Sequence, residues 1–323
     1  MNAPKFAGFL AGLAGAMLFV APAQAKVYEG GITHAEMQKL LVDAGFNALA
    51  VEEEDAKPDA VPDLVVMGGP ARWYVEFMAC KEGRCADLHL HAGFNVEGAV
   101  SQAIVTEMNQ ALLGKLSGNV YVDDEQDPIL QADVNTDGVT DAHLIYQVRS
   151  FDALDRLMCT HVGYWSKADT ASAYDKLLLV ATPKVPTEDK ADVIDAIEAK
   201  DFQSMLEDDG FRVTEARATS TALAKSFVVS KSGAAWFAEV PLIDDWRVTF
   251  SAMPEVFFKN GSAIANNFNR EHRWVSLTCP SIYMDGRLAV VLRGGITRHA
   301  LVVMANTFDE MLHTLPGGMG EKK

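Results

Sequence analysis

The chain matches itself at four places, and this internal repeat limits its fold more than any other feature of the sequence. The matched pairs are Leu41–Phe46 with Leu206–Phe211, Met108-Asn109 with Phe268-Asn269, Gly138–Thr140 with Gly295–Thr297, and Phe151-Asp152 with Phe308-Asp309. Their separation falls from 165 to 160 to 157 residues and then stays at 157, as duplication followed by loop shortening would produce. We therefore expect two modules, at 26–162 and 200–315, with a linker at 163–199 and a flexible tail at 316–323.

Each copy shows the same order of helical and strand patterns. In the first copy, Thr33 and Glu36 form a capping-box pattern that opens a helix, and Gly45 ends it. Strand-like runs at 48–53, 63–67, 71–80 and 85–94 then predict an antiparallel meander. A second helix near 98–112, strands at 116–122 and 129–134, and a closing helix capped by Thr140 follow. The predicted fold class is α+β, with two tandem α-β(meander)-α-β-β-α modules, each an antiparallel sheet packed against helices.

Residues 1–25 have the composition of a cleavable export signal. Lys5 precedes an apolar stretch at 6–20, and Ala23 and Ala25 match the small-residue pattern of a cleavage site. The alternative is an uncleaved anchor, but the stretch is shorter than the roughly 20 residues of a spanning helix. We therefore expect cleavage after Ala25, a periplasmic or otherwise extracytoplasmic location, and no membrane insertion of the mature chain.

The charge balance argues against nucleic acid as a partner. The formal net charge is −16 at pH 7, and cleavage of the signal removes one further positive charge at Lys5. An acidic surface repels phosphate backbones and lacks the clustered Lys and Arg of a nucleic-acid footprint. The acidity would attract basic peptides or cations, although solubility alone also explains it.

Taken together, the helix ending in Gly-Phe, the meander, the Asn at 109 and 269 and the Gly-x-Thr openings of the closing helices resemble the YbjN family, also described as bacterial sensory transduction regulators. The family is similar in fold to type III secretion chaperones, small modules that pair and offer surfaces to partner polypeptides. The resemblance covers nearly the whole mature chain twice. It implies a non-catalytic, chaperone-like or regulatory protein-binding role without a cofactor, with the two modules able to pair as an intramolecular pseudo-dimer.

The residues of the family pattern mark a candidate interaction surface at Asn109, Asn269 and Arg273. The second copy has the aromatic-Asn pair Phe268-Asn269 and an Arg four residues later, whereas the first copy has Met108 before Asn109 and no such Arg. A surface built on these positions is therefore expected mainly in the second copy.

The two cysteines of the first hairpin predict a structural disulfide. If Cys80 and Cys85 lie opposite each other, Tyr74, Glu76 and Met78 face His91, His89 and Asp87 on one side. The other side is then apolar throughout, which supports the register. A redox motif would need Cys-x-x-Cys at a helix start, not Cys-x4-Cys between strands. Cys159 and Cys279 are left either as buried free thiols, which we favour, or as a bridge between the modules.

One loop carries a calcium-like pattern. Asp133, Asn135, Asp137 and Asp141 occupy ligand positions of an EF-hand loop, and Gly138 occupies its glycine position. The twelfth position is Leu144 instead of the bidentate Glu, and the matching stretch 290–295 of the second copy has no carboxylate. A plain strand-to-helix turn is the preferred interpretation.

His89 and His91 share a strand face with Glu76 and Asp87, a grouping that would suit zinc if a rigid fourth ligand were supplied. Plain polar pairing on a hairpin is the simpler interpretation. No nucleophile elbow, zincin helix, Walker loop or dinucleotide fingerprint occurs in the sequence. Three hypotheses remain: an exported protein-interaction module, which is preferred, a periplasmic hydrolase or metal-dependent enzyme, and a calcium-responsive binding protein.

Overall fold

The structure, a computed structural model, describes residues 26–51, 61–67, 72–96, 100, 102–112, 116–163, 192–221, 223–242, 247–252, 261–271, 276–278, 285–292 and 295–314. The predicted export signal, most of the predicted linker and the predicted tail lie outside these residues, as do Arg273 and Cys279. Over the described ranges, no helix is both long and apolar enough to cross a membrane.

The predicted α+β class is confirmed, with three antiparallel sheets and six helices in the described residues. The helices of the first half are α1 (His34–Asp43), α2 (Gln102–Leu112) and α3 (Asp141–His161). Its sheet has the order β3 (Asn47–Val51), β4 (Asp63–Met67), β5 (Arg72–Lys81), β6 (Arg84–Gly93), β8 (Pro128–Asn135) and β7 (Gly118–Val122), and β2 (Ile32–Thr33) pairs with β6.

The second half repeats this arrangement. Its helices are α5 (Ala199–Asp208), α6 (Gly261–Glu271) and α7 (Arg298–Leu312). Its sheet has the order β11 (Arg212–Glu215), β12 (Ala224–Ser230), β13 (Ala235–Pro241), β14 (Arg247–Ala252), β16 (Asp285–Val291) and β15 (Ser276–Thr278). In both sheets the four-stranded meander lies next to the final strand of that half, and the strand that precedes the final strand in the sequence lies at the edge. The strand order of the two sheets is therefore the same.

Local sequence signals explain where the helices begin and end. Thr33 accepts a hydrogen bond from the Glu36 amide, and the Glu36 carboxylate accepts one from the Thr33 amide, so the predicted capping box is present. Thr140 and Thr297 cap α3 and α7 by accepting hydrogen bonds from the His143 and Ala300 amides, without the reciprocal carboxylate. Gly45, with φ of 92°, occupies the left-handed region just after α1, as expected for a helix stop.

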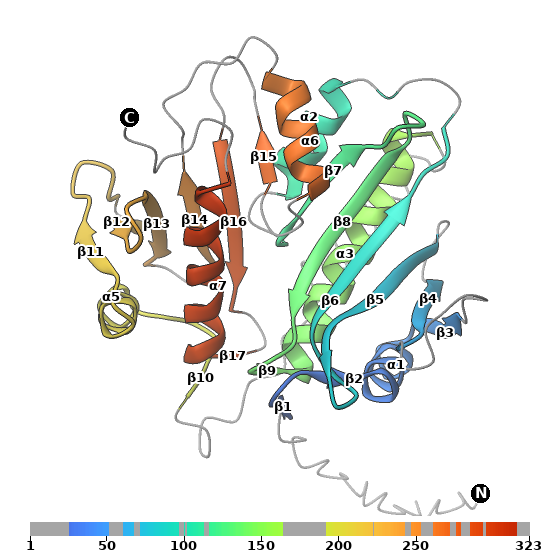
Figure 1. Ribbon diagram of the computed structural model, residues 1–323, viewed down its shortest axis with the longest axis horizontal. Helices are drawn as coiled ribbons and strands as arrows, with labels where there is room; N and C mark the ends of the chain where they lie inside the picture. Colours follow the sequence, from blue (N-terminus) through green and yellow to red (C-terminus); the bar gives the residue numbers. More distant parts are fainter. Residues whose placement is uncertain are drawn as a thin grey trace, which may run out of the picture.

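Each half buries an aromatic core between its sheet and its helices. In the first half, Trp73 packs against Phe46 and Phe151. In the second half, Trp236 contacts the matching Phe211 and Phe308, and Phe250 adds a further ring. Figure 1 shows α3 behind β6 and β8 and α7 in front of β14 and β16, so the two closing helices cover opposite sides of their sheets.

A small third sheet joins the halves. Its order is β1 (Val27–Tyr28), β9 (Val139–Thr140), β17 (Ile296–Thr297) and β10 (Val193–Ile194), so each half contributes two strands. Val139 lies opposite Ile296, and the Thr140 amide donates to the Gly295 carbonyl at 3.1 Å. The two Gly-x-Thr motifs of the repeat therefore pair with each other. The predicted strand-to-helix turn between β8 and α3 therefore contains a short strand, β9.

A second contact between the halves lies at the other end of the molecule, where α6 packs on β7 and α2 packs on β15 (Figure 1). The Asn266 amide bonds to both the N–H and the C=O of Val122, at 2.8 and 3.0 Å. The Arg270 guanidinium meets the Asp124 carboxylate through two bonds of 2.7 and 2.9 Å. Gln131 donates to the backbone carbonyl of Asn269 at 2.6 Å.

Candidate functional site

The first sheet has one face packed against α3 and an opposite face, which we call the outer face of the first sheet. Trp73, Val75, Leu88 and Leu90 belong to the buried core. Because side chains alternate along a strand, their neighbours lie on the outer face. The strand register gives three cross-strand rows there: Tyr74, His91 and Gln131; Glu76, His89 and Asp133; and Met78, Asp87 and Asn135. The hairpin register predicted from the sequence is confirmed.

Two histidine–carboxylate pairs lie side by side on this face. His89 Nδ1 is 2.7 Å from Asp133 Oδ1 in a buried contact, and His91 Nε2 is 3.2 Å from Glu76 Oε1. The two imidazole rings stack at a centroid distance of 5.2 Å with planes 7° apart. Tyr74 stacks on the other side of His91, also at 5.2 Å. We call Tyr74, Glu76, Asp87, His89, His91 and Asp133 the titratable cluster.

Asp87 is the member of this cluster whose pKa is raised. Burial, followed by the charge of Asp133, raises the pKa of Asp87 to about 6. Asn135 partly opposes this by donating a hydrogen bond of 3.3 Å to Asp87. Asp87 therefore takes up a proton as the pH falls from neutral toward 6.

The second half provides an internal comparison, because its strands have the same order. At the matching registers Phe237 lies opposite Ser251, Glu239 lies opposite Thr249, and Arg247 lies opposite Val291. Glu239 matches Glu76. At these registers, no other residue of the titratable cluster recurs as the same residue type in the second half. The fold therefore does not need the titratable cluster, which makes the cluster a candidate for function.

Exposed apolar side chains adjoin the cluster on the same face. Leu49 on β3 is 50% exposed, Met67 on β4 is 43% exposed and Met78 on β5 is 36% exposed. Val65 lies between Leu49 and Tyr74 in the register. Solvent-facing apolar residues at the edge of a sheet are a feature of binding surfaces. Leu49 and Met67 were not predicted as surface residues, although apolar residues at successive strand positions signal apolar character on both faces of a strand.

The structure corrects the candidate interaction surface at Asn109 and Asn269. These side chains are 2% and 1% exposed. Asn109 bonds to the N–H and C=O of Val120, and Asn269 bonds to the N–H and C=O of Leu277. Each asparagine thus occupies the open edge of β7 or β15 in the manner of a neighbouring strand, which prevents it from contacting a partner. Arg273, the third predicted residue, is outside the described residues.

The predicted calcium ligands are not brought together. Asp133 bonds to His89, Asn135 bonds to Asp87, and Asp137 accepts from the Gly30 amide at 2.7 Å. Asp141 accepts from the Ala142 amide at the start of α3. Each side chain serves a different local contact, so the stretch does not form an EF-hand loop.

The suggested zinc grouping is present as pairs and not as a cage. His89 is directed at Asp133 and His91 at Glu76. In the parts of the chain that the structure covers, no group of three or more His, Cys, Asp or Glu side chains is arranged to hold a metal ion.

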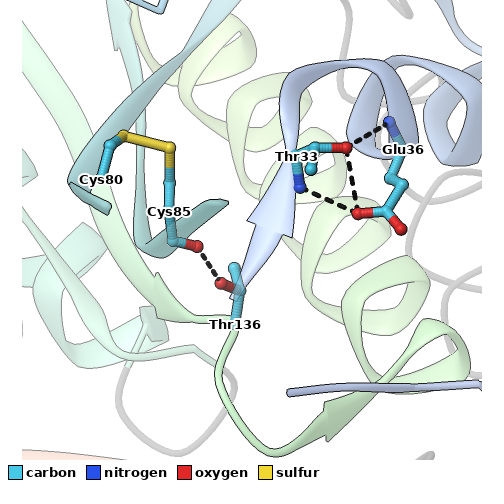
Figure 2. Close-up of a disulfide and its surroundings, with 5 residues drawn as sticks. All are labelled: Thr33, Glu36, Cys80, Cys85 and Thr136. Atoms are coloured by element: carbon cyan, nitrogen blue, oxygen red, sulfur yellow. Dashed lines mark hydrogen bonds between the residues drawn. A yellow bond between two sulfur atoms is a disulfide. The ribbon is translucent and has the colours of Figure 1, made fainter. Parts of the chain in front are cut away.

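The predicted disulfide between Cys80 and Cys85 is present. Figure 2 shows it beside Thr136, whose hydroxyl donates to the Cys85 carbonyl at 2.5 Å, and near the Thr33–Glu36 capping box of α1. The bond therefore closes the hairpin tip where β6 meets β2 and the end of β8. Cys159 is free and buried, which agrees with the preferred prediction for that residue.

A buried carboxylate on α3 has no signal in the sequence. Asp155 is fully buried, and neither of its oxygens has a hydrogen-bond partner. Burial, followed by the charge of Asp152, raises the pKa of Asp155 to about 7. Burial and the charge of Asp155 raise the pKa of the Cys159 thiol to about 12, so this thiol is not an activated nucleophile.

A serine, an aspartate and a histidine meet in the second half without forming a catalytic triad. The Ser232 hydroxyl donates to Asp309, and His313 Nε2 is 3.2 Å from the same hydroxyl. Asp309 also accepts from the Trp236 indole at 3.1 Å. A triad needs the aspartate on the imidazole, whereas this aspartate ties the β12–β13 turn to α7.

Comparison with known proteins returned no relative: no family model, no curated protein and no solved structure matches the chain.

Proposed function

We propose that the chain is an exported, non-catalytic protein-interaction module of the YbjN type, and that it binds a partner polypeptide on the outer face of the first sheet. The observation that carries this proposal is the group of exposed apolar side chains on one face, Leu49, Met67 and Met78, beside the stacked Tyr74. Water-exposed apolar surface of this kind gains free energy when a partner covers it.

The location of the surface supports the proposal. β7 and β15, the sheet edges that face the other half, are occupied by asparagine side chains. β3 lies at the opposite end of the first sheet, so a partner can reach its outer face without separating the halves. The Cys80–Cys85 disulfide is compatible with an extracytoplasmic location, and the proposed export would place the partner there too.

Site-specific photocrosslinking in the producing cells tests this proposal. A benzophenone amino acid at Leu49 is compared with the same group at Thr214, which occupies the matching position of β11 and is also exposed. We expect a discrete polypeptide adduct at position 49 that is absent at position 214.

The crosslinked polypeptide must then bind when purified. We expect Leu49→Asp to weaken its binding at least tenfold and Thr214→Asp to leave it unchanged. Equal adducts at both positions, or an equal response to both substitutions, would refute the proposal.

A further inference from the structure

The outer faces of the two sheets carry opposite charge. On the first sheet the outward positions of β4, β5 and β6 include Asp63, Glu76 and Asp87, against a single Arg72, while the outward Asp133 of β8 is buried against His89. On the second sheet the outward positions include Arg212, Arg247 and Arg287, against Glu239 and Asp285. The two faces share one topology, so this difference reflects the sequences and not the fold.

The acidic character is concentrated next to the exposed apolar side chains. Glu76 on β5 lies in the row beside that of Leu49, Val65, Tyr74 and His91, and Asp87 on β6 lies one row further along. Burial is the main cause of the raised pKa of Asp87, and the charges of Asp133 and Asp137 raise it further. A ligand that carries positive charge would relieve this repulsion as it binds.

We infer that the partner of this face is an extended polypeptide segment whose sheet-facing side chains, at every second residue, are apolar at one end, where they cover Leu49 and Met67, and basic at the other end, where they lie over Glu76 and Asp87. This inference rests on the proposed function.

The dimensions of the sheet agree with a short segment. Neighbouring strands are about 4.8 Å apart, so three strand spacings separate β3 from β6, or roughly 14 Å. An extended chain advances about 3.3 Å per residue, so about five residues cross from the apolar end of the surface to the acidic end.

A basic partner also fits the charge of the whole chain. The formal net charge of −16 raises the local concentration of cationic polypeptides and speeds their encounter. The same charge opposes association with a second copy of this chain, which would bring two strongly acidic molecules together.

Defined peptides test the inference by fluorescence anisotropy with the full-length mature protein. The probes are fluorescein-labelled Val-Ser-Val-Ser-Lys-Ser-Lys, its Glu-for-Lys counterpart and its Ser-for-Lys counterpart. We expect the lysine peptide to bind at least tenfold more tightly than the other two at low salt. Because exposed charge pairs are screened by salt, its affinity should fall as the ionic strength rises.

Matched variants separate a local site from the general acidity of the protein. The double variant Glu76→Gln, Asp87→Asn should weaken the lysine peptide at least fivefold. The control Glu239→Gln makes the Glu76→Gln change at the matching position of the second sheet and should have no effect. Arg247 occupies the matching position of Asp87 in the second half, so loss of that carboxylate is compatible with the fold. Unchanged thermal unfolding of the double variant checks that loss of Glu76 is tolerated as well.

Three outcomes overturn the inference. These are equal binding of the lysine and glutamate peptides, equal weakening by Glu239→Gln and the double variant, and a crosslinked complex with the mass of two copies of this chain. The proposed function is judged separately. An adduct at position 49 to another protein whose binding ignores the double variant would keep that function and remove only the basic partner.

Discussion

The two halves of the molecule share the features that build the fold and differ in the features of one face. Both have the strand order of a meander followed by a reversed pair, a central tryptophan packed on two phenylalanines, and an asparagine on the last edge strand. Only the first half has the titratable cluster and the Cys80–Cys85 bridge. Features found in both halves are structural requirements, whereas those found in one half either serve a function or are tolerated at a cost.

The shared asparagines should give the largest effects. Asn109→Ala and Asn269→Ala each leave a buried backbone N–H and C=O without a partner, at Val120 and Leu277 respectively. We expect each variant to lose about 2–4 kcal/mol of unfolding free energy, measured by urea denaturation. The control is the exposed Asn267, which lies on α6 with Asn269. Asn267→Ala should change stability by no more than about 0.5 kcal/mol. If one half tolerates its substitution, the halves do not share this requirement.

The buried Asp155 occurs in only the first half, and its ionised form destabilises the folded state. Its counterpart on α7, at the repeat separation of 157 residues, is the buried Leu312. The pKa of Asp155 is raised from 3.8 to about 7, so folding disfavours the ionised form. The contribution of Asp155 to stability therefore falls as the pH rises from about 4 to about 7, and the penalty is complete above that range.

Asp155→Leu should remove this penalty. We expect a gain of about 2–4 kcal/mol at pH 8 and little gain at pH 4, measured as the difference between variant and parent in urea at each pH. Glu107→Leu, which replaces an exposed carboxylate on α2, is the control. A gain of the same size at both pH values would show that packing, and not the charge of Asp155, causes the effect.

The disulfide sharpens the comparison of the two hairpins. The second-half hairpin has no cysteine between Pro241 and Arg247, so the fold forms without a bridge there. The bridge closes a loop with a sequence separation of only 5. We expect Cys80→Ala, Cys85→Ala to lose about 1–2 kcal/mol, by thermal and urea unfolding. Added reductant should destabilise the parent and not the double variant, and an effect on both would point to another cause.

The sequence predicted the parts of this structure that depend on local pattern and on the repeat. The capping box at Thr33 and Glu36, the hairpin register and the disulfide follow from residue spacing alone. The repeat indicated equivalent elements, and the matching strand orders agree with it.

Long-range packing explains what the sequence did not predict. Asn109 and Asn269 stood out because they recur, but recurrence does not distinguish a surface residue from one that caps a buried strand edge. The pairing of β9 with β17 depends on how two distant segments meet, and no local pattern reports that. The calcium-like spacing of Asp133 to Asp141 failed because β8 continues through Asn135 and directs alternate side chains to different neighbours.

Substitution of the core tryptophans tests whether the two cores are built alike, and it should give the smallest change in unfolding free energy. The Trp236 indole donates to Asp309, whereas the buried Trp73 indole has no hydrogen-bond partner, and the matching Asp152 pairs with Arg156. Replacement by phenylalanine removes similar packing from both cores but a hydrogen bond from only one. We therefore expect Trp236→Phe to cost about 1 kcal/mol more than Trp73→Phe, measured by urea denaturation.

Removing the acceptor isolates the hydrogen bond in the second half. In an Asp309→Ala background the Trp236 indole has lost its partner, so the extra cost of Trp236→Phe should disappear if the bond causes it. A difference that persists in this background would instead mean that the two cores are packed differently. In that case the resemblance of the halves would extend to their topology and not to the way their cores are filled.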